Sequence, residues 1–282
     1  MGMMRSMTGF GKGSAECATA RITIEIRSLN SKGLDLTLRY PSLYREREMD
    51  WRKNLGDAVT RGKVDVNIHR EAVGQEAVGL QKEWLEQAMQ SLQDIAGDPI
   101  PKVQLLNMAL RLPTPHVSEE IQDAEWAAVD AALEEALHDF QSFREREGAE
   151  LAKDLRASLE SIQAGLQEVP ALEEERVEAL KARLHRGLEG MEYDSNRFEQ
   201  ELIYYLEKLD VNEEKVRLQA HLDHFQEAMH EGQGRKLGFI SQEIGREINT
   251  LGSKSNHAGM QRIVVQMKEE LEKIKEQSLN VL

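Results

Sequence analysis

The stretch ATARITIEIRSLN, residues 18–30, alternates apolar and polar side chains from Ala20 to Ile26. A period of two is typical of a β-strand that buries one of its faces. The same alternation returns at residues 34–38 and 64–68, so three strands are expected in the first quarter of the chain.

Two further segments complete this N-terminal part. Residues 43–60, between the second and third of these strands, are predicted to form a helix. The opening residues 5–13, RSMTGFGKG, are expected to add a strand edge and a glycine-rich turn. Together these elements predict a small α+β unit over residues 1–75, in the order βββαβ.

The rest of the chain has no such alternation and is predicted to be helical. Short helices are expected at 80–96 and 102–110, on either side of the breaker GDPIP. A second breaker, LPTPHVSEE at 112–120, precedes another helix. From about residue 145 a narrow apolar stripe predicts a long helix packed against another helix. The stripe consists of Leu151, Leu155, Leu159, Ile162 and Leu166.

Pro170 is predicted to end this long helix, and a second stripe from Leu172 to Leu188 is expected to begin the next. The simplest arrangement of the two is a projecting antiparallel helical hairpin. The predicted fold class is therefore α+β, a small β-rich unit followed by a long all-helical region. The expected parts are the α+β unit (1–75), a helical connector (76–145), the hairpin (146–195) and a C-terminal helical region (196–282), with helices at 197–230, 236–250 and 259–280.

Composition narrows the class of protein. The 282-residue chain has one cysteine, Cys17, and no apolar run long enough to span a membrane, so a cytoplasmic protein is expected. The formal net charge of −14 argues against non-specific coating of nucleic acid. Residues 1–70 nevertheless contain 13 Lys and Arg against 8 Asp and Glu, a net charge of +5. This asymmetry fits a localised surface for an anionic ligand, or charge that is merely scattered over the surface.

Several familiar kinds of site are absent from the sequence. It contains no phosphate-binding loop motif, no H-E-x-x-H zinc motif and no G-x-S-x-G nucleophile elbow. The candidates that remain lie in two neighbouring segments near the C-terminus.

The first candidate segment is LEKLDVNEEKVRLQAHLDHF, residues 206–225. Helical spacing places five of its polar side chains on one stripe: Asp210, Glu214, Arg217, His221 and His224. A carboxylate, a guanidinium and imidazoles on one line can bind a divalent metal, or can supply acid–base groups and a phosphate clamp. The alternative is a solvated helix face held by ion pairs such as Glu213–Arg217.

The second segment is GRKLGFISQEIGREINTLGSKSN, residues 234–256. Glu243 and Glu247 are one helical turn apart, and Arg246 follows Glu243 by three residues. Paired carboxylates beside an arginine fit metal-assisted phosphoryl chemistry, and they fit an interhelical salt-bridge network equally well. The loop around Lys254 can hold phosphate oxygens or can simply cap a helix.

Five stretches of the sequence together closely resemble the YicC/YloC family of bacterial stress-associated proteins. They are RSMTGFGKG (5–13), EIRSLNSKGLDL (25–36), RGKVDV (61–66), DVNEEKVRLQAHLDHF (210–225) and residues 234–256. The resemblance implies an endoribonuclease that cuts single-stranded RNA with the help of a divalent metal. It also implies a homo-oligomer, expected to be a hexamer whose helical arms surround a channel.

The hypothesis for the site uses positions that match these family motifs, and it adds the basic residue Lys32, where the family usually has Asn-His-Arg in place of Asn30-Ser31-Lys32. The expected catalytic residues are Glu243, Glu247, His221, Arg246 and Arg217. The expected ligands of Mn²⁺ or Mg²⁺ are Glu243, Glu247, Glu214 and His221. The expected RNA-binding residues are Arg27, Asn30, Lys32, Arg61, Lys63, Arg235, Lys236 and Lys254.

Two glycines depart from the family pattern within the second segment. The family usually has Asp where this chain has Gly238, and Asn where it has Gly245. Two other interpretations of the motifs stay open. One is a non-catalytic oligomeric RNA-binding adaptor that presents RNA to a separate nuclease, and the other is a structural assembly protein.

Overall fold

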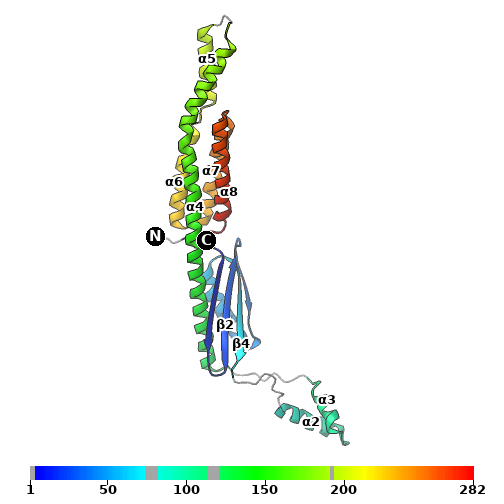
Figure 1. Cartoon of the computed structure of the whole chain (residues 1–282). Helices are drawn as coiled ribbons and strands as arrows, with labels where there is room; N and C mark the ends of the chain where they lie inside the picture. Colours follow the sequence, from blue (N-terminus) through cyan, green and yellow to red (C-terminus); the bar gives the residue numbers. More distant parts are fainter. Residues whose placement is uncertain (1–3, 74–81, 113–120, 191–193) are drawn as a thin grey trace.

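The computed structural model describes residues 4–73, 82–112, 121–190 and 194–282, and it shows an elongated molecule with a small sheet toward one end and a helical bundle beyond it (Figure 1). This arrangement confirms the α+β fold class. Along the chain the elements are β1 (Gly9–Glu16), β2 (Ala20–Leu29), β3 (Leu34–Arg39), the 3-10 helix η1 (Ser42–Arg47), α1 (Glu48–Val59), β4 (Gly62–Ala72), α2 (Lys82–Ala96), α3 (Lys102–Ala109), α4 (Asp123–Gly187), α5 (Ser195–Lys208), α6 (Asn212–Glu231), α7 (Gly234–Lys254) and α8 (Ala258–Ser278).

The sheet has the strand order β1-β2-β4-β3, in which only the β3–β4 pair is parallel. The alternating residues of β2, including Ile22, Ile24 and Ile26, are fully buried on one face of the sheet. They share a hydrophobic core with Trp51 of α1 and Phe140 of α4. The predicted order βββαβ is confirmed, and the opening segment supplies the edge strand β1. The glycine-rich turn expected there is corrected, because Gly9, Gly11 and Gly13 lie within the strand.

The glycines of β1 let the first half of α4 lie directly against the strand. A Cβ atom built on Gly11 would come within 2.5 Å of the backbone nitrogen of Phe140, and closer still to the carbonyl oxygen of Ala136. A Cβ atom on Gly13 would lie 2.6 Å from the nitrogen of Ala136. Both distances are far below van der Waals contact, so any larger residue would push the helix off the strand.

The helix α4 corrects the prediction of a break at Pro170, because it runs without interruption from Asp123 to Gly187 with this proline inside it. Buried residues flank the proline on both sides, Val169 next to it and Arg176 further on. Packing along the whole length therefore offsets the missing backbone donor of proline, which alone would disfavour a helix interior by about 3 kcal/mol.

The hairpin predicted over residues 146–195 is corrected, because both of its apolar stripes lie in the single helix α4. The structure has a different hairpin, formed by the end of α4 and α5. The chain reverses after Leu188, and α5 returns alongside the end of α4, where the ring centroids of His185 and Phe198 are 5.1 Å apart. The single helix expected over 197–230 is also corrected, since α5 ends at Lys208 and α6 begins at Asn212.

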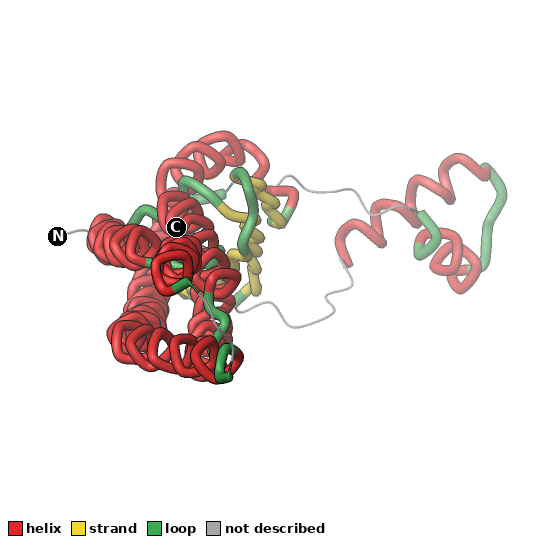
Figure 2. Tube along the Cα trace, turned by 90° about the horizontal axis from the view of Figure 1, so that it is seen from above, coloured by secondary structure: helices red, strands yellow, loops and turns green. Residues whose placement is uncertain are grey.

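The second half of α4 forms a four-helix bundle with α6, α7 and α8 (Figures 1 and 2). All four helices contribute side chains to the core of the bundle. The largest fully buried side chains of this core include Leu155, Ile162, Leu218, Leu222, Phe225 and Leu237. The helices α2 and α3 pack on each other and lie apart from the remainder in both views (Figures 1 and 2). Within the described segments, no helix is long and apolar enough to cross a bilayer.

Candidate active site

The helix α7 carries the paired carboxylates of the second candidate segment and has two neighbours in the bundle. One flank faces α8, where a Cβ atom on Gly252 would lie 2.9 Å from Val264 and one on Gly245 would lie 3.1 Å from Leu271. The opposite flank faces α6, as the ion pair of Lys254 with Glu214 demonstrates. The two glycines thus bring α7 close to α8 and leave its longer polar side chains on the α6 side.

The antiparallel pairing of α6 and α7 places His221 opposite Glu247. The contact between Lys254 Nζ and Glu214 Oε1, 2.7 Å, fixes the register of the two helices. Seven residues make about two helical turns, so stepping seven positions along each helix returns to the same seam. The step leads to His221 on α6 and to Glu247 on α7, a pairing that the spacing within either helix cannot predict.

Glu247 is buried, with only 9% of its surface exposed, although it is a carboxylate. Among the residues that the structure describes, it has neither an ion-pair nor a hydrogen-bond partner. Its two carboxylate oxygens are not among the buried side-chain atoms that lack a partner, so they reach the surface between α6 and α7 and are open to a ligand. Glu243, one turn away, is half-buried and pairs with the exposed Arg246 at 3.1 Å.

The polar side chains expected to form one stripe on α6 have different partners in the structure. Arg217 forms an ion pair with Glu213 on the exposed side, as the alternative interpretation of this stripe proposed. Asp210 accepts a hydrogen bond from the backbone of Asn212 at 3.0 Å where α6 begins. Glu214 is buried beside Lys254, and its second oxygen, Oε2, is buried without a hydrogen-bond partner. Glu214 lies two turns from His221, about 10 Å along the axis.

The described residues contain no group of three or more His, Cys, Asp or Glu side chains placed to hold one metal ion together. A smaller protein donor set suits Mg²⁺, which commonly keeps several waters and binds through one or two carboxylates and a substrate phosphate. The donors at the α6–α7 seam, namely Glu243, Glu247 and His221, are of the right chemistry for Mg²⁺ or Mn²⁺.

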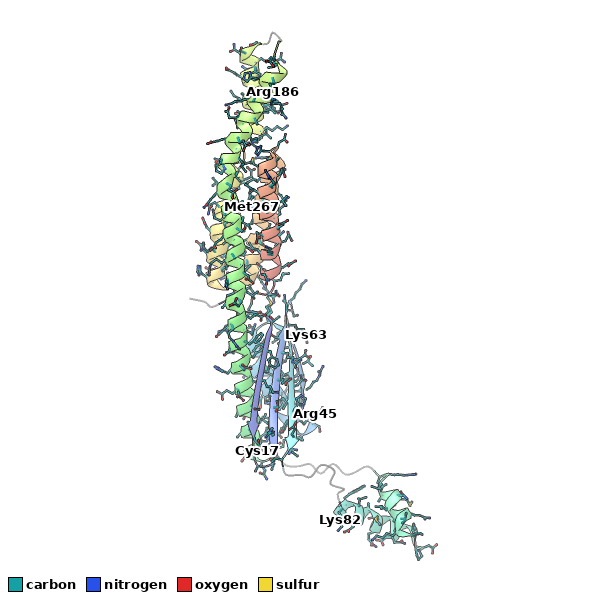
Figure 3. All side chains as sticks on the ribbon, in the orientation of Figure 1. Cys17, Arg45, Lys63, Lys82, Arg186 and Met267 are labelled. Carbon is teal, nitrogen blue, oxygen red and sulfur yellow. The ribbon has the colours of Figure 1, made fainter. Side chains whose placement is uncertain are left out.

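The N-terminal RNA-binding candidates gather at the end of the sheet that faces the bundle, where Figure 3 labels Lys63. Asn30 donates from Nδ2 to the carbonyl oxygen of Leu279 at 2.7 Å, so the end of β2 touches the C-terminal end of α8. Lys63 pairs with Leu29 in the β2–β4 register, and the Nε of Arg61 donates to Ser31 at 2.8 Å. Arg27 and Lys32 are exposed near the same end.

The basic residues at the start of α7 lie near this junction too. A Cβ atom on Gly234 would lie 2.9 Å from the carbonyl carbon of Val281, whose neighbour Asn280 accepts a hydrogen bond from Met7 at 2.8 Å. Arg235 and Lys236 follow directly and are exposed, Lys236 in an ion pair with Glu231 at 2.8 Å. Candidates from both ends of the sequence thus meet where sheet and bundle join, whereas Lys254 lies at the far end of α7.

A basic pocket beside the projecting hairpin was missed by the sequence analysis. Arg176, Arg183 and Arg186 line it from α4, and Tyr205 and Lys208 from α5. The spacings of seven and three along α4 place the arginines on one face. The predicted break at Pro170 and the single helix over 197–230 hid the fact that these residues face each other.

Comparison with known proteins agrees with the motifs. The N-terminal region of the YicC-like endoribonucleases matches residues 4–153, and their C-terminal part matches residues 166–282. The chain is 30% identical to the probable endoribonuclease YicC of Clostridioides difficile (strain 630), across 99% of this chain and 100% of that protein.

It is 32% identical to the probable endoribonuclease YicC of Haemophilus influenzae (strain ATCC 51907 / DSM 11121 / KW20 / Rd), with the same coverage of 99% and 100%. The matches include both candidate segments and the strands of the sheet. The chain belongs to the YicC-like endoribonuclease family.

Proposed function

We propose that this protein is a metal-dependent endoribonuclease that cleaves single-stranded RNA at the seam between α6 and α7. The observation that carries the proposal is Glu247, a largely buried residue whose carboxylate has no partner among the described residues and whose oxygens remain accessible. It lies one turn from Glu243, and counting helical turns from the Lys254–Glu214 contact places it opposite His221. Family membership supports the RNA-cleaving activity, because both relatives compared above are named probable endoribonucleases.

The residues of the seam have distinct roles in this proposal. Glu247 and Glu243 would hold Mg²⁺ or Mn²⁺ together with waters, and His221 would be the group that moves a proton. When bound, the ion supplies a water of lowered pKa and positive charge next to the scissile phosphate. Arg246 is exposed beside Glu243 and can turn toward a phosphate oxygen. Arg217, now paired with Glu213, is a second guanidinium on the same side of α6 as His224.

RNA reaches the seam along exposed cations rather than over the whole acidic surface. Arg27, Lys32 and Lys63 at the end of the sheet, with Arg235 at the start of α7, form a basic area below the seam. Such contacts with phosphates are electrostatic, so RNA binding is expected to weaken steeply with salt.

The same proposal includes assembly of the chain into a homo-oligomer, with the hexamer as the expected form. Its support is the exposure of large apolar side chains on the outer faces of the bundle, since Val216, Phe239 and Val265 have 63%, 70% and 52% of their surfaces exposed. These side chains belong to α6, α7 and α8, so each of the three helices offers an exposed apolar group against which another copy can pack.

The decisive experiment compares Glu247→Gln with wild type in the cleavage of an end-labelled single-stranded RNA, with Mn²⁺ or with EDTA. The substitution keeps the shape of the side chain and removes its charge, so cleavage is expected to fall by at least about 100-fold. Retention of RNA binding by the variant would assign the loss to chemistry.

The matched control is Glu227→Gln, which makes the same change on the exposed face of α6 and is expected to cleave as wild type does. Equal cleavage by all three proteins would refute the assignment of the site. RNA binding without cleavage by wild type under every metal would favour the adaptor instead. Light scattering of the same preparations tests the assembly, which a mass of 32.0 kDa, that of one chain, would contradict.

A further inference from the structure

A pocket of about 580 Å³ lies where the projecting hairpin meets the bundle. Its walls come from the last part of α4, the end of α5 and the connection between α7 and α8. Figure 3 labels Arg186 on the projection, beyond the ends of α7 and α8. The pocket is therefore separate from the α6–α7 seam and from the basic area at the end of the sheet.

The pocket lining is basic in a protein whose net charge is −14. It includes Arg176, Arg183, Arg186, Lys208 and His257 and contains neither Asp nor Glu. Positive charge concentrated in a concave surface attracts an anion more strongly than the same charge spread over a convex one.

Three of these cations are not neutralised by the chain itself. Over the described segments, Arg183, Arg186 and Lys208 form no ion pair; Arg186 donates only to the carbonyl oxygen of Ala182 at 3.3 Å. Most cations of the neighbouring bundle helices do have a carboxylate within 4.0 Å: Lys215, Arg217, Lys236, Arg246, Lys254, Lys273 and Lys275. The three pocket cations are therefore available to bind an anionic ligand.

The remaining lining suits a planar ring rather than a bare anion. Leu180, Leu184 and Leu209 provide an apolar surface, and Tyr205 has 48% of its surface exposed at the opening. Base–aromatic stacking with a neighbouring cation is the usual mode of binding single-stranded nucleic acid.

Two buried groups preorganise the pocket. Arg176 is buried and donates to the carbonyl oxygens of Leu209 at 3.0 Å and Lys254 at 3.3 Å, which ties α4 to the end of α5 and to the end of α7. His257 has a buried Nδ1 atom without a hydrogen-bond partner, while its Nε2 lies 3.7 Å from Glu175. A buried polar atom left unsatisfied in a pocket wall is a place where a ligand can supply the missing bond.

We propose that this pocket binds a nucleotide of the single-stranded RNA, with its phosphate at Arg183, Arg186 and Lys208 and its base stacked on Tyr205. The inference rests on the proposed function and adds to it a second point of attachment. Arg176 contacts Lys254, which is seven residues from Glu247, or about 10 Å along α7. An RNA strand held in the pocket therefore extends directly to the α6–α7 seam.

The test measures binding of a fluorescein-labelled oligouridylate by fluorescence anisotropy, in EDTA and over a series of KCl concentrations. The first variant is Arg183→Ala/Lys208→Ala, and both side chains are exposed, so the fold is kept. Its control, Arg156→Ala/Lys268→Ala, removes two exposed cations of α4 and α8 that lie outside the pocket lining. The second pair is Tyr205→Ala and Tyr205→Phe.

If the pocket binds RNA, loss of two phosphate contacts reduces the salt slope of binding by about 1.4, whereas the control keeps the wild-type slope. Tyr205→Ala weakens binding by about tenfold, and Tyr205→Phe, which retains the ring, binds as wild type does. Equal slopes for the pocket variant and wild type, with RNA still bound and cleaved, would overturn this inference and leave the proposed function standing. Failure of wild type to bind RNA at all would overturn both.

Discussion

At the scale of single residues, the carboxylate with the most hydrogen bonds in the described part of the chain lies beside the sheet rather than at the candidate site. Glu125, in the first turn of α4, accepts hydrogen bonds from Arg70 at 2.8 Å, Tyr44 at 2.7 Å and Thr19 at 3.0 Å. The hydrogen bond from Arg70 is the main reason that the pKa of Glu125 is lowered, against the opposing effect of burial. Desolvation, with the hydrogen bond to Glu125, raises the pKa of Tyr44.

These shifts predict how stability depends on pH. A carboxyl with a lowered pKa in the folded state contributes stability above its unfolded pKa, about 4.3, and loses it as the pH falls through the folded value. The free energy of unfolding of Glu125→Gln should therefore be lower than that of wild type at neutral pH, and the difference should shrink in acid. Urea unfolding at neutral pH and at about pH 3 measures this.

The matched control for this prediction is Glu134→Gln, an exposed carboxylate two and a half turns along α4. It should follow the pH profile of wild type. A difference between Glu125→Gln and wild type that is as large in acid as at neutral pH would mean that Glu125 acts through packing instead of charge.

The sequence anticipated some residues of the candidate site and not others, for a physical reason. Glu243 and Glu247 are related by one helical turn, and such a spacing is visible in the sequence alone. The pairing of His221 with Glu247 depends on the register between α6 and α7, which the left-handed Gly232 and the short turn after it set. Local periodicity contains no information on that register.

At the scale of elements, the contact between β1 and α4 decides how the two halves of the molecule join. The strand approaches so closely that only glycine fits at alternate positions, Gly9, Gly11 and Gly13. The glycines are visible in the sequence. Their role, which is to let α4 pack directly on β1, cannot be predicted from it, because the helix that covers them comes about 120 residues later.

The substitution Gly11→Ala should strongly destabilise this contact. The new Cβ atom would clash with the backbone of Ala136 and Phe140, which cannot move without shifting the helix, so a loss of about 3 kcal/mol or more is expected in urea unfolding. The control is Gly238→Ala in α7, where a Cβ atom meets nothing within 4 Å. That variant should gain about 0.5–1 kcal/mol, because alanine favours a helix. A tolerated Gly11→Ala would show that β1 is not tightly fixed on α4.

Pro170 shows why the prediction of separate elements was incomplete. Local propensity favours a break at a proline, and the prediction followed it. The structure contains instead a continuous apolar surface, from Leu155 and Ile162 to Val169 next to the proline, all buried in the bundle core. Tertiary burial along the bundle outweighs the loss of one helical hydrogen bond.

At the scale of the whole molecule, the chain leaves the sheet unit before α2 and returns to the same place after α3. Before the pair, Val73 donates its backbone N–H to Thr19 at 2.9 Å. After it, Glu125 accepts a hydrogen bond from the side chain of Thr19 at 3.0 Å. The chain could therefore pass from β4 to α4 through a short connection.

Replacing residues 74–120 with a short Gly-Ser linker should leave the remaining fold intact. A shorter loop closes at little entropic cost, so the free energy of unfolding should change by less than about 1 kcal/mol. RNA cleavage should be retained, because no residue proposed for the site lies in 74–120. Urea unfolding and the cleavage assay with the full chain as reference test this. A loss of several kcal/mol would mean that α2 and α3 support the core.

The uninterrupted course of α4 has a mechanical consequence. Its 65 residues extend about 98 Å, from the sheet unit to the tip of the hairpin, and the N-terminal family match ends, and the C-terminal match begins, within it. From Phe140, at the contact with β1, to the end of α4 is about 70 Å, so a tilt of about 5° at that contact would move the end of the helix by about 6 Å. Any small rotation of α4 against the glycines of β1 would therefore appear as a larger displacement of the hairpin.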